Sequence, residues 1–270
     1  MTARRAPALF VSHGAPTELI RAGAWQTALE YFGLEVRPRA VVVMSAHWRS
    51  RSGFDVGYQS KFSTIHDFSG FPEALNQFAY PAAGDLNLAE QCVELLRGAA
   101  MPSVLVSNRG LDHGAYVPLV KMWPKADIPV IPVAISASAP PEDIFRAGEI
   151  LAPLRREGVV ILGSGGMVHN LGDLAWNDEE NQQPDSWAEE FYIWVRNALI
   201  RRDFNSLCGF LEQAPQGSRA HPTWEHFAPL LFACGASSAW DESFDEIYSS
   251  WSFKNLSMSC FTYGTWLSHA

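Results

Sequence analysis

The feature that most constrains the fold is the run at residues 40–45, Ala-Val-Val-Val-Met-Ser. This run is rich in β-branched side chains and does not alternate with polar residues, which is typical of a strand buried on both faces of a parallel sheet. Other short apolar runs, separated by stretches of helical spacing, lie at residues 7–12, 103–107, 128–135 and 159–163. The alternation predicts an α/β fold, with one domain over residues 1–270, a mostly parallel central sheet and helices on both faces.

The remaining elements follow from apolar spacing and from capping residues. Predicted helices lie at residues 23–32, 86–97, 117–122, 141–156, 186–199, 202–213 and 225–234. Asp85 is placed to cap the second of these, Gly158 follows the fourth, and Pro229 predicts a kink in the last. Residues 60–84 read as a loop, residues 56–58 as an edge strand and residues 261–264 as a final strand.

Composition excludes several classes of protein. Of the 270 residues 47% are hydrophobic and 18% charged, so the chain can bury a sizeable core. Its 29 acidic residues against 20 basic residues give a net charge of −9, which does not favour nucleic-acid binding. No stretch approaches the roughly 20 apolar residues of a membrane helix, and the first apolar run is too short for a signal peptide. We expect a cytoplasmic protein that binds neither membrane nor nucleic acid.

The cysteines lie far apart and form no C-x-x-C pair; they are Cys92, Cys208, Cys234 and Cys260. Their apolar or mixed surroundings predict buried free thiols in a reducing compartment. Any metal would therefore be held by other residues.

Histidines carry the strongest functional signal. His13 follows the first predicted strand, His47 follows the run at residues 40–45, and His169 comes one glycine-rich turn after the strand at residues 159–163. A single loop histidine is more often solvated or bound by one hydrogen bond. These three are expected to converge at one edge of a parallel sheet, where neutral imidazoles could hold a divalent metal.

The other histidines are less constrained. His113 lies in a predicted loop, His66 could line a pocket, and His269 near the C-terminus is expected to be exposed. His221 and His226 would point about 140° apart on one helix, and we favour His226 as the metal-facing residue.

Common catalytic motifs are absent. The sequence has no G-x-S-x-G element, no H-E-x-x-H helix and no Walker loop. The glycine-rich segment at residues 163–166 lacks the Lys-Ser/Thr pair of a phosphate loop, and we interpret its small residues as allowing a tight turn beside the site.

Six short motifs occur in one order: Ser-His-Gly-Ala-Pro at 12–16, Ser-Ala-His-Trp at 45–48, Ile-His-Asp-Phe at 65–68, Asp-His-Gly at 112–114, Gly-Ser-Gly-Gly-Met-Val-His-Asn-Leu at 163–171 and Pro-Thr-Trp-Glu-His at 222–226. Together they resemble the DOPA-dioxygenase branch of the class III extradiol ring-cleaving dioxygenases, the superfamily of the protocatechuate 4,5-dioxygenase catalytic subunit. The resemblance runs from about residue 8 to the C-terminus. It implies a single-domain α/β fold and a non-haem divalent metal, Fe(II) in the active enzyme, with Zn(II) able to occupy the same site in isolated protein.

The resemblance also implies roles for single residues. His13 and His47 match the two early metal ligands, and His226 matches the third. His169 matches a histidine at the metal, either a further ligand or the acid/base. His113 matches a histidine that hydrogen-bonds the substrate or oxygen.

Some assignments stay open at this point. The wider superfamily uses two histidines and one glutamate, so Glu225 is an alternative third ligand. His66, Asp112 and Trp48 are predicted to contact the substrate. Trp48 and Phe68 are the aromatic residues best placed to face a ring, although aromatic side chains more often serve the core.

The implied reaction inserts both atoms of O2 into a catechol, DOPA-like or related, and gives a ring-opened semialdehyde. We expect His169 to take a proton from a metal-acidified hydroxyl and His113 to steer substrate or oxygen. The alternatives are a zinc-dependent hydrolase using the same imidazoles and a non-catalytic metal-binding member of the superfamily. The sequence specifies neither the catechol nor the oligomeric state, and Arg49, Arg109 and Lys121, which lie near motifs, receive no role.

Overall fold

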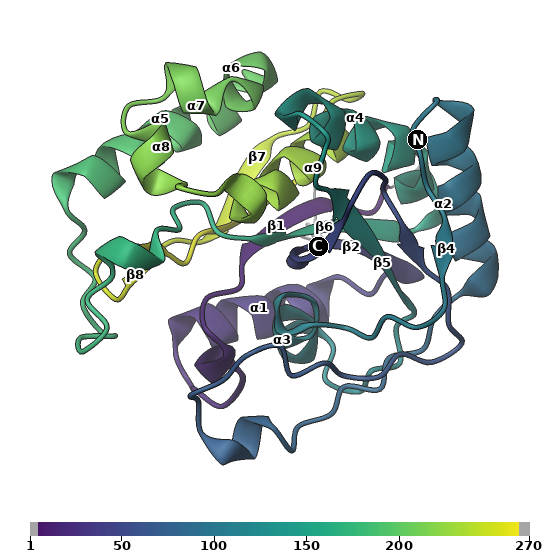
Figure 1. Cartoon of the computed structure of the whole chain (residues 1–270), viewed down its shortest axis with the longest axis horizontal. Coiled ribbons are helices and arrows are strands. Elements are labelled where there is room, and N and C mark those ends of the chain that lie inside the picture. The colour runs from purple at the N-terminus through teal and green to yellow at the C-terminus, as the bar shows by residue number, and fades with distance from the viewer. Residues whose placement is uncertain (1–4, 265–270) are drawn as a thin grey trace.

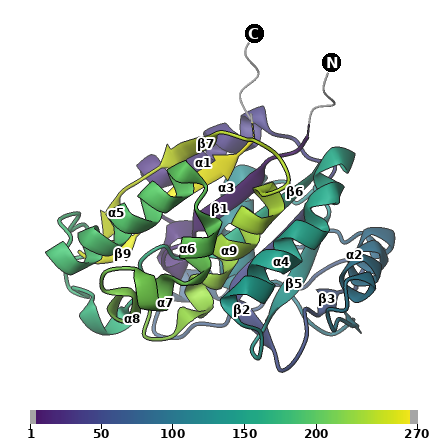
Figure 2. The same cartoon turned by 90° about the horizontal axis from the view of Figure 1, so that it is seen from above.

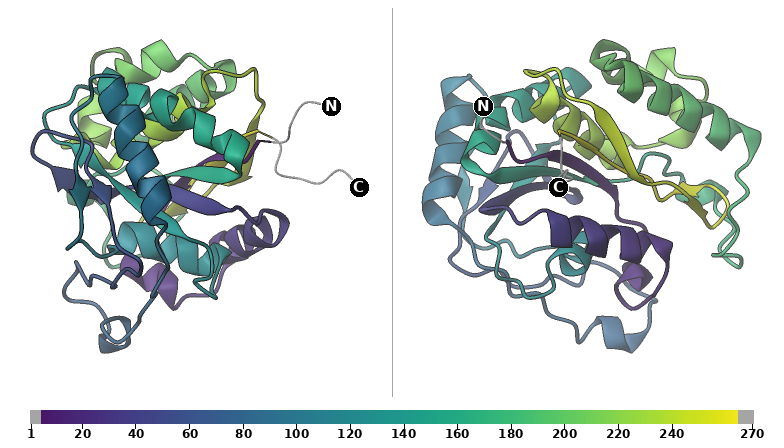
Figure 3. Two further views of the ribbon diagram at one scale, coloured as in Figure 1. Left: turned by 90° about the vertical axis from the view of Figure 1, so that its right-hand side faces the viewer. Right: turned by 180° about the vertical axis from the view of Figure 1, so that it is seen from behind.

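The computed structural model describes residues 5–264, in which one eight-stranded sheet lies between two layers of helices (Figure 1). The strand order is β4-β3-β5-β2-β6-β1-β10-β7. These strands are β1 (Ala8–Ser12), β2 (Ala40–Ser50), β3 (Val56–Gly57), β4 (Leu105–Val106), β5 (Val130–Ser136), β6 (Val159–Gly165), β7 (Phe244–Tyr248) and β10 (Cys260–Tyr263). The central strands β5, β2, β6 and β1 are parallel, while β10 and β7 continue the sheet in antiparallel pairing beyond β1 (Figure 3). The predicted α/β fold with a mostly parallel sheet is confirmed.

Helices cover both faces of this sheet. They are α1 (Ala24–Glu35), α2 (Leu86–Gly98), α3 (His113–Met122), α4 (Pro141–Leu151), α5 (Ser186–Arg201), α6 (Phe204–Cys208), α7 (Phe210–Gln213), α8 (Gly217–Ala220) and α9 (Ala228–Ser237). Short 3₁₀ turns are η1 (Pro16–Leu19), η2 (Glu73–Leu75), η3 (Ala152–Glu157), η4 (Leu171–Asp173) and η5 (Trp224–His226). Helices α4 and α9 lie side by side over one face (Figure 2), and α1 and α3 lie under the other (Figure 1).

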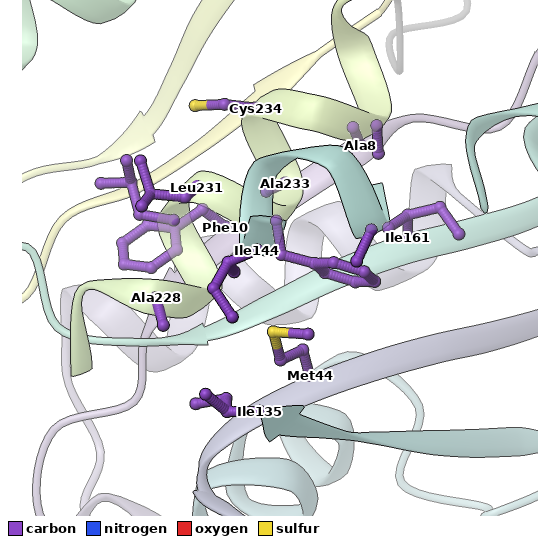
Figure 4. Close-up of a cluster of buried hydrophobic side chains, with 14 of the residues drawn as sticks. Ala8, Phe10, Met44, Ile135, Ile144, Ile161, Ala228, Leu231, Ala233 and Cys234 are labelled. Atoms are coloured by element: carbon purple, nitrogen blue, oxygen red, sulfur yellow. The ribbon is translucent and has the colours of Figure 1, made fainter. Parts of the chain in front are cut away.

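Two hydrophobic cores explain why β2 is apolar without alternation. Val42 and Met44 pack with the α4 and α9 side, whereas Val41 and Val43 pack with the α1 and α3 side. Figure 4 shows Met44 and Ile161 facing the helices of the first core. Because both faces are covered, every second side chain enters a different core, and the strand is apolar throughout.

Several boundaries differ from the predictions. Helix α3 begins at His113, four residues before its predicted start, because the Asp112 carboxylate accepts a hydrogen bond from the Ala115 amide and caps the first turn. The predicted kinked helix at residues 225–234 is instead the turn η5 followed by α9, in which Pro229 occupies the first helical turn and causes no kink.

Capping predictions elsewhere agree with the structure. Asp85 accepts a hydrogen bond from the Leu88 amide at 3.0 Å, and Gly158 closes η3 with a left-handed φ of 80°. The strand β7 and the small hairpin β8 (Trp251–Ser252) and β9 (Leu256–Ser257) were not predicted. Their short, polar-flanked runs carry little periodic signal.

Within residues 5–264 no helix is long and apolar enough to cross a membrane. The four cysteines are unpaired and buried.

Candidate metal centre and active site

Two histidines stand side by side because the sheet register places them at one level. Val11 of β1 and Ser45 of β2 both pair with Ser164 of the intervening strand β6. His13 and His47 each come two residues later, and side chains two residues apart point to the same face. Their Nε2 atoms lie 3.1 Å apart.

Three further imidazoles surround this pair. His113 is the first residue of α3, His226 is the last of η5, and His169 follows β6. The ring centre of His47 lies 4.0 Å from that of His113 and 5.0 Å from that of His226. The ring of His169 is parallel to that of His226, with centres 3.5 Å apart. The structure therefore brings together five of the six histidines that the sequence placed at the metal or the substrate, and His66 is the exception.

Nitrogen atoms of this cluster are close enough to share an ion. In His13, His47 and His113, one ring nitrogen each lies within 4.8 Å of the other two. The ring centre of His13 is 5.1 Å from that of His47, 5.4 Å from that of His113 and 5.5 Å from that of His226.

Hydrogen bonds fix the tautomer of His13. The Ser164 hydroxyl donates to the carbonyl oxygen of Gly114, so its oxygen is left to accept from Nδ1 of His13 at 3.0 Å. With the proton on Nδ1, Nε2 carries a lone pair, which is the form that binds a metal.

Asp67 links two other imidazoles. One carboxylate oxygen accepts from both the backbone amide and Nδ1 of His113, each at 3.0 Å, and the other lies 3.4 Å from Nδ1 of His47. Burial raises the pKa of Asp67, but the hydrogen bonds from His113 outweigh it and lower the pKa to about 2. Asp67 is therefore an ionised carboxylate that orients both rings through Nδ1.

Glu225 lies behind His226 as an orienting group. Its Oε1 is 3.3 Å from Nδ1 of His226 and accepts a hydrogen bond from the Thr223 hydroxyl at 3.0 Å. A carboxylate on Nδ1 with Nε2 directed elsewhere is a common arrangement around metal-bound histidine.

Burial keeps four of the imidazoles neutral. It lowers the pKa of His13 and His226 well below the ordinary value of 6.5, with neighbouring histidines adding to the effect. Burial also lowers the pKa of His47 and His169 to about 4. Neutral rings at pH 7 have lone pairs available, as metal ligation and proton acceptance require.

Small residues let backbone approach the cluster. A Cβ atom on Gly114 would lie 2.4 Å from the Ser45 hydroxyl and 2.9 Å from the His47 ring. On Gly163 and Gly165 it would lie 1.9 Å and 2.1 Å from carbonyl oxygens of the segment that crosses β6. The predicted role of segment 163–166 in a tight turn is corrected here: Gly163 and Gly165 belong to β6, have no left-handed φ, and serve close approach.

A cavity of about 220 Å³ opens over the imidazoles. All five histidines of the cluster line it. The other lining residues have apolar side chains or none: Gly14, Ala15, Pro16, Phe68, Phe71, Leu171, Leu174, Trp176, Phe253 and Leu256. Phe68, which the sequence pointed to as a residue facing a ring, lies in this wall.

Trp48 is not brought to the cavity. It follows His47 in the part of β2 where the pairing with β5 shifts register, between Met44 and Arg49, and its side chain does not line the cavity. Its indole lies under the Arg109 guanidinium, whose carbon is 5.8 Å from the ring centre, and it is 9% exposed.

Asp112 and His66 also lie outside the lining. Asp112 is buried and accepts hydrogen bonds from the Ser45 hydroxyl at 2.6 Å and from Arg109 at 2.8 Å. It therefore holds α3 against β2. The Nε2 atom of His66 lies 2.9 Å from the Phe78 carbonyl oxygen in an exposed loop.

His221 is separated from the site for a different reason than the sequence suggested. It shares no helix with His226, since it follows α8 and His226 belongs to η5. It is buried beside Phe227, and its Nε2 bonds the Met167 carbonyl oxygen at 3.0 Å. His269 lies outside the described residues.

Sequence reasoning gave no role to several residues that shape the site. Asp67 belonged to one of the six motifs, and its place beside His66 was the available signal. Ser164 lay in another motif. The wall residues Leu174 and Phe253 carried no signal, because only the packing of distant segments brings them to the cavity.

Comparisons with known proteins agree with this geometry. Residues 9–260 match the family described as the catalytic LigB subunit of aromatic ring-opening dioxygenase. The chain belongs to this family. The enzyme is 39% identical over 246 residues to a protein of Escherichia coli named 4,5-DOPA dioxygenase extradiol, covering 89% of this chain and 88% of that one. It is 36% identical over 252 residues to a protein of the same name from Beta vulgaris, covering 90% of each.

A solved structure shows the same fold. It is the crystal structure of an uncharacterized protein of Escherichia coli K12, with a TM-score of 0.81 and 34% sequence identity, covering 96% of this chain and all of that one. The enzyme thus lies in the extradiol branch of the ring-opening dioxygenases, as the six motifs predicted.

Proposed function

We propose that the enzyme is a non-haem Fe(II)-dependent extradiol dioxygenase that inserts both atoms of O2 into a catechol and gives a ring-opened semialdehyde. The observation that carries this proposal is the convergence of five imidazoles beneath an apolar cavity. Family membership supplies the reaction class. The four buried free thiols support a place in the reducing cytoplasm.

The donor set fits a divalent transition metal. Imidazole nitrogens suit both iron and zinc, and the Nε2 atoms of His13 and His47 face each other at 3.1 Å while burial disfavours a second proton on either ring. Two facing lone pairs at this distance repel unless a cation lies between them. Fe(II) bound there would supply the one-electron chemistry that allows O2 to react with an aromatic ring.

Ring separations support His226 as the third ligand. Three imidazoles that bind one ion through Nε2 at about 2.1 Å would have ring centres about 4.5–5.5 Å apart, depending on the angle at the ion. The centres of His13, His47 and His226 are 5.1, 5.5 and 5.0 Å apart, a nearly equilateral triangle. The 4.0 Å between His47 and His113 is shorter than this geometry expects. Glu225 is then the group that orients His226.

His169 and His113 remain for proton transfer and positioning. His169 is neutral at pH 7 and stacks on His226, so it can accept a proton from a catechol hydroxyl bound over the cluster. His113 has an ionised carboxylate on Nδ1, which favours donation of a hydrogen bond to the substrate or oxygen from Nε2 when the ring is protonated. The apolar walls above them exclude water.

The test is oxygen consumption by protein reconstituted anaerobically with Fe(II) and given a panel of catechols. Oxygen uptake that matches a yellow semialdehyde mole for mole supports the proposal. If metal is bound and no catechol consumes oxygen, the proposal is wrong, and a hydrolase or a binding role replaces it.

A further inference from the structure

The walls of the cavity carry no charge that could hold a charged substrate. Outside the imidazoles, six side chains form most of the wall: Phe68, Phe71, Leu171, Leu174, Trp176 and Phe253. Within residues 5–264, no lysine, arginine, aspartate or glutamate lines the cavity. Leu171 and Trp176 are 50% and 55% exposed at its rim, so the opening itself is apolar.

The wall is built into the fold and does not depend on a bound molecule. The segment that carries Trp176 is joined to the β8–β9 hairpin by backbone hydrogen bonds from Ala175 to the Phe253 carbonyl oxygen and from Phe253 to that of Glu179, both 3.0 Å. Asn255, 1% exposed, donates to the Asp173 carbonyl oxygen at 2.8 Å from within this hairpin.

Phe253 takes a left-handed φ of 48°, which is strained for a bulky residue. Its ring nevertheless faces the indole of Trp176, with centres 5.4 Å apart. Lys254 beside it has a left-handed φ of 69°, and both residues belong to the turn between β8 and β9, which holds Phe253 in this wall.

Nearby cations are already held elsewhere. Arg109 points away from the cavity and binds Asp112 and the His47 carbonyl oxygen at 2.8 and 3.2 Å. Lys254, which follows the strained residue, pairs with Asp185 at 2.5 Å. Neither can meet a carboxylate in the cavity without breaking these contacts.

We propose that the substrate is a catechol whose ring substituent is uncharged and apolar, an alkyl or aryl group, and not a charged amino-acid side chain. This inference rests on the proposed function. A carboxylate or ammonium group against the apolar wall would lose water without gaining a side chain of opposite charge, which is unfavourable. An alkyl chain against the same wall gains about fourfold in binding for each methylene that it buries.

The experiment compares matched substrates on the Fe(II)-loaded enzyme: 4-propylcatechol, 3-(3,4-dihydroxyphenyl)propionate and L-DOPA. The first two differ mainly in the charge at the end of the chain. We expect kcat/KM for 4-propylcatechol to exceed that for the propionate and for L-DOPA by more than tenfold. Calorimetric titration of zinc-loaded protein gives the same order without turnover.

A variant pair locates the effect in the wall. Leu174→Arg introduces a cation there, and Leu174→Met keeps the wall apolar with a similar volume. We expect Leu174→Arg to move the ratio of kcat/KM toward the propionate by at least tenfold, and Leu174→Met to leave the ratio within about twofold.

The outcomes separate the two proposals. If the enzyme cleaves L-DOPA or the propionate at least as efficiently as 4-propylcatechol, ring cleavage stands and the substrate class is wrong. If no catechol is cleaved, the proposed function is wrong and this inference falls with it.

Discussion

Gly114 offers the sharpest test of how helix α3 shapes the metal centre. A Cβ atom at this position would lie 2.4 Å from the Ser45 hydroxyl, 2.9 Å from the ring of His47 and 3.1 Å from that of His13. The first contact is about 1 Å too short, so either the Ser45 hydroxyl must turn away and lose its hydrogen bond to Asp112, or helix and strand must move apart. Metal–ligand distances tolerate only about 0.2 Å. Gly114→Ala should therefore damage the metal site more than the fold.

The two effects differ in size. Overpacking lowers the free energy of unfolding by about 1–3 kcal/mol. The better helix propensity of alanine raises it by up to about 1 kcal/mol. A net loss of about 1 kcal/mol lowers Tm by about 2–4 °C for a chain of this size. Displaced ligands should reduce zinc affinity at least tenfold, by analogy with the loss of groups that orient metal-binding histidines.

The assay is a competition titration of zinc against a chelator, with thermal unfolding of the metal-free protein measured in parallel. Gly98→Ala is the matched control, since a Cβ on Gly98 at the end of α2 meets nothing within 4 Å. That variant should bind zinc like the parent. If Gly114→Ala also does so, the reasoning from close approach is refuted.

Three further predictions concern single histidines. His169→Gln should lower kcat of the iron-loaded enzyme at least about a hundredfold, because the variant lacks the proton acceptor. Elemental analysis should show that the variant still binds metal. Loss of metal would instead make His169 a ligand. Burial lowers the pKa of His221 to about 3, so the folded state favours the neutral ring while the unfolded chain takes up a proton below about pH 6.5. The free energy of unfolding should therefore decrease as the pH falls from about 6.5 toward 3, by up to about 1.4 kcal/mol per pH unit. Urea unfolding of metal-free protein between pH 7 and pH 5 should show a smaller loss for His221→Gln than for the parent, and equal losses would contradict this. His66→Ala should leave kcat/KM within about twofold, because His66 lies outside the cavity lining; a large loss would restore its predicted substrate contact.

The sequence predicted the centre of the fold better than its margins. The run at residues 40–45 determined its own strand, because burial on both faces demands continuous apolar side chains. The continuation of β2 to Ser50 was not predicted, because the last residues of the strand are mostly polar and include His47 of the candidate site. The start of α3 was missed because its cap, Asp112, was interpreted as a substrate contact.

The candidate site divides in a similar way. Histidines after strands could be predicted to converge, since parallel strands end at one edge. Trp48 could not be excluded from the cavity in advance, because the register of β2 shifts between Met44 and Arg49 and simple alternation does not place its side chain. The roles of Asp67 and the wall residues depend on contacts between segments far apart in the chain, which no local pattern encodes.

The glycines of β6 have a consequence for how readily the centre accepts an ion. His226 belongs to a short turn, yet its carbonyl oxygen accepts a hydrogen bond from the Gly166 amide at 2.9 Å, and the missing side chain of Gly165 lets that carbonyl rest on the strand. His226, the third ligand of the proposed metal site, is held by main chain in this way and is ordered as soon as the protein folds. The conformational entropy of the imidazoles is therefore lost when the protein folds and not when the ion binds. Ion binding then requires only that the cation lose its hydration shell.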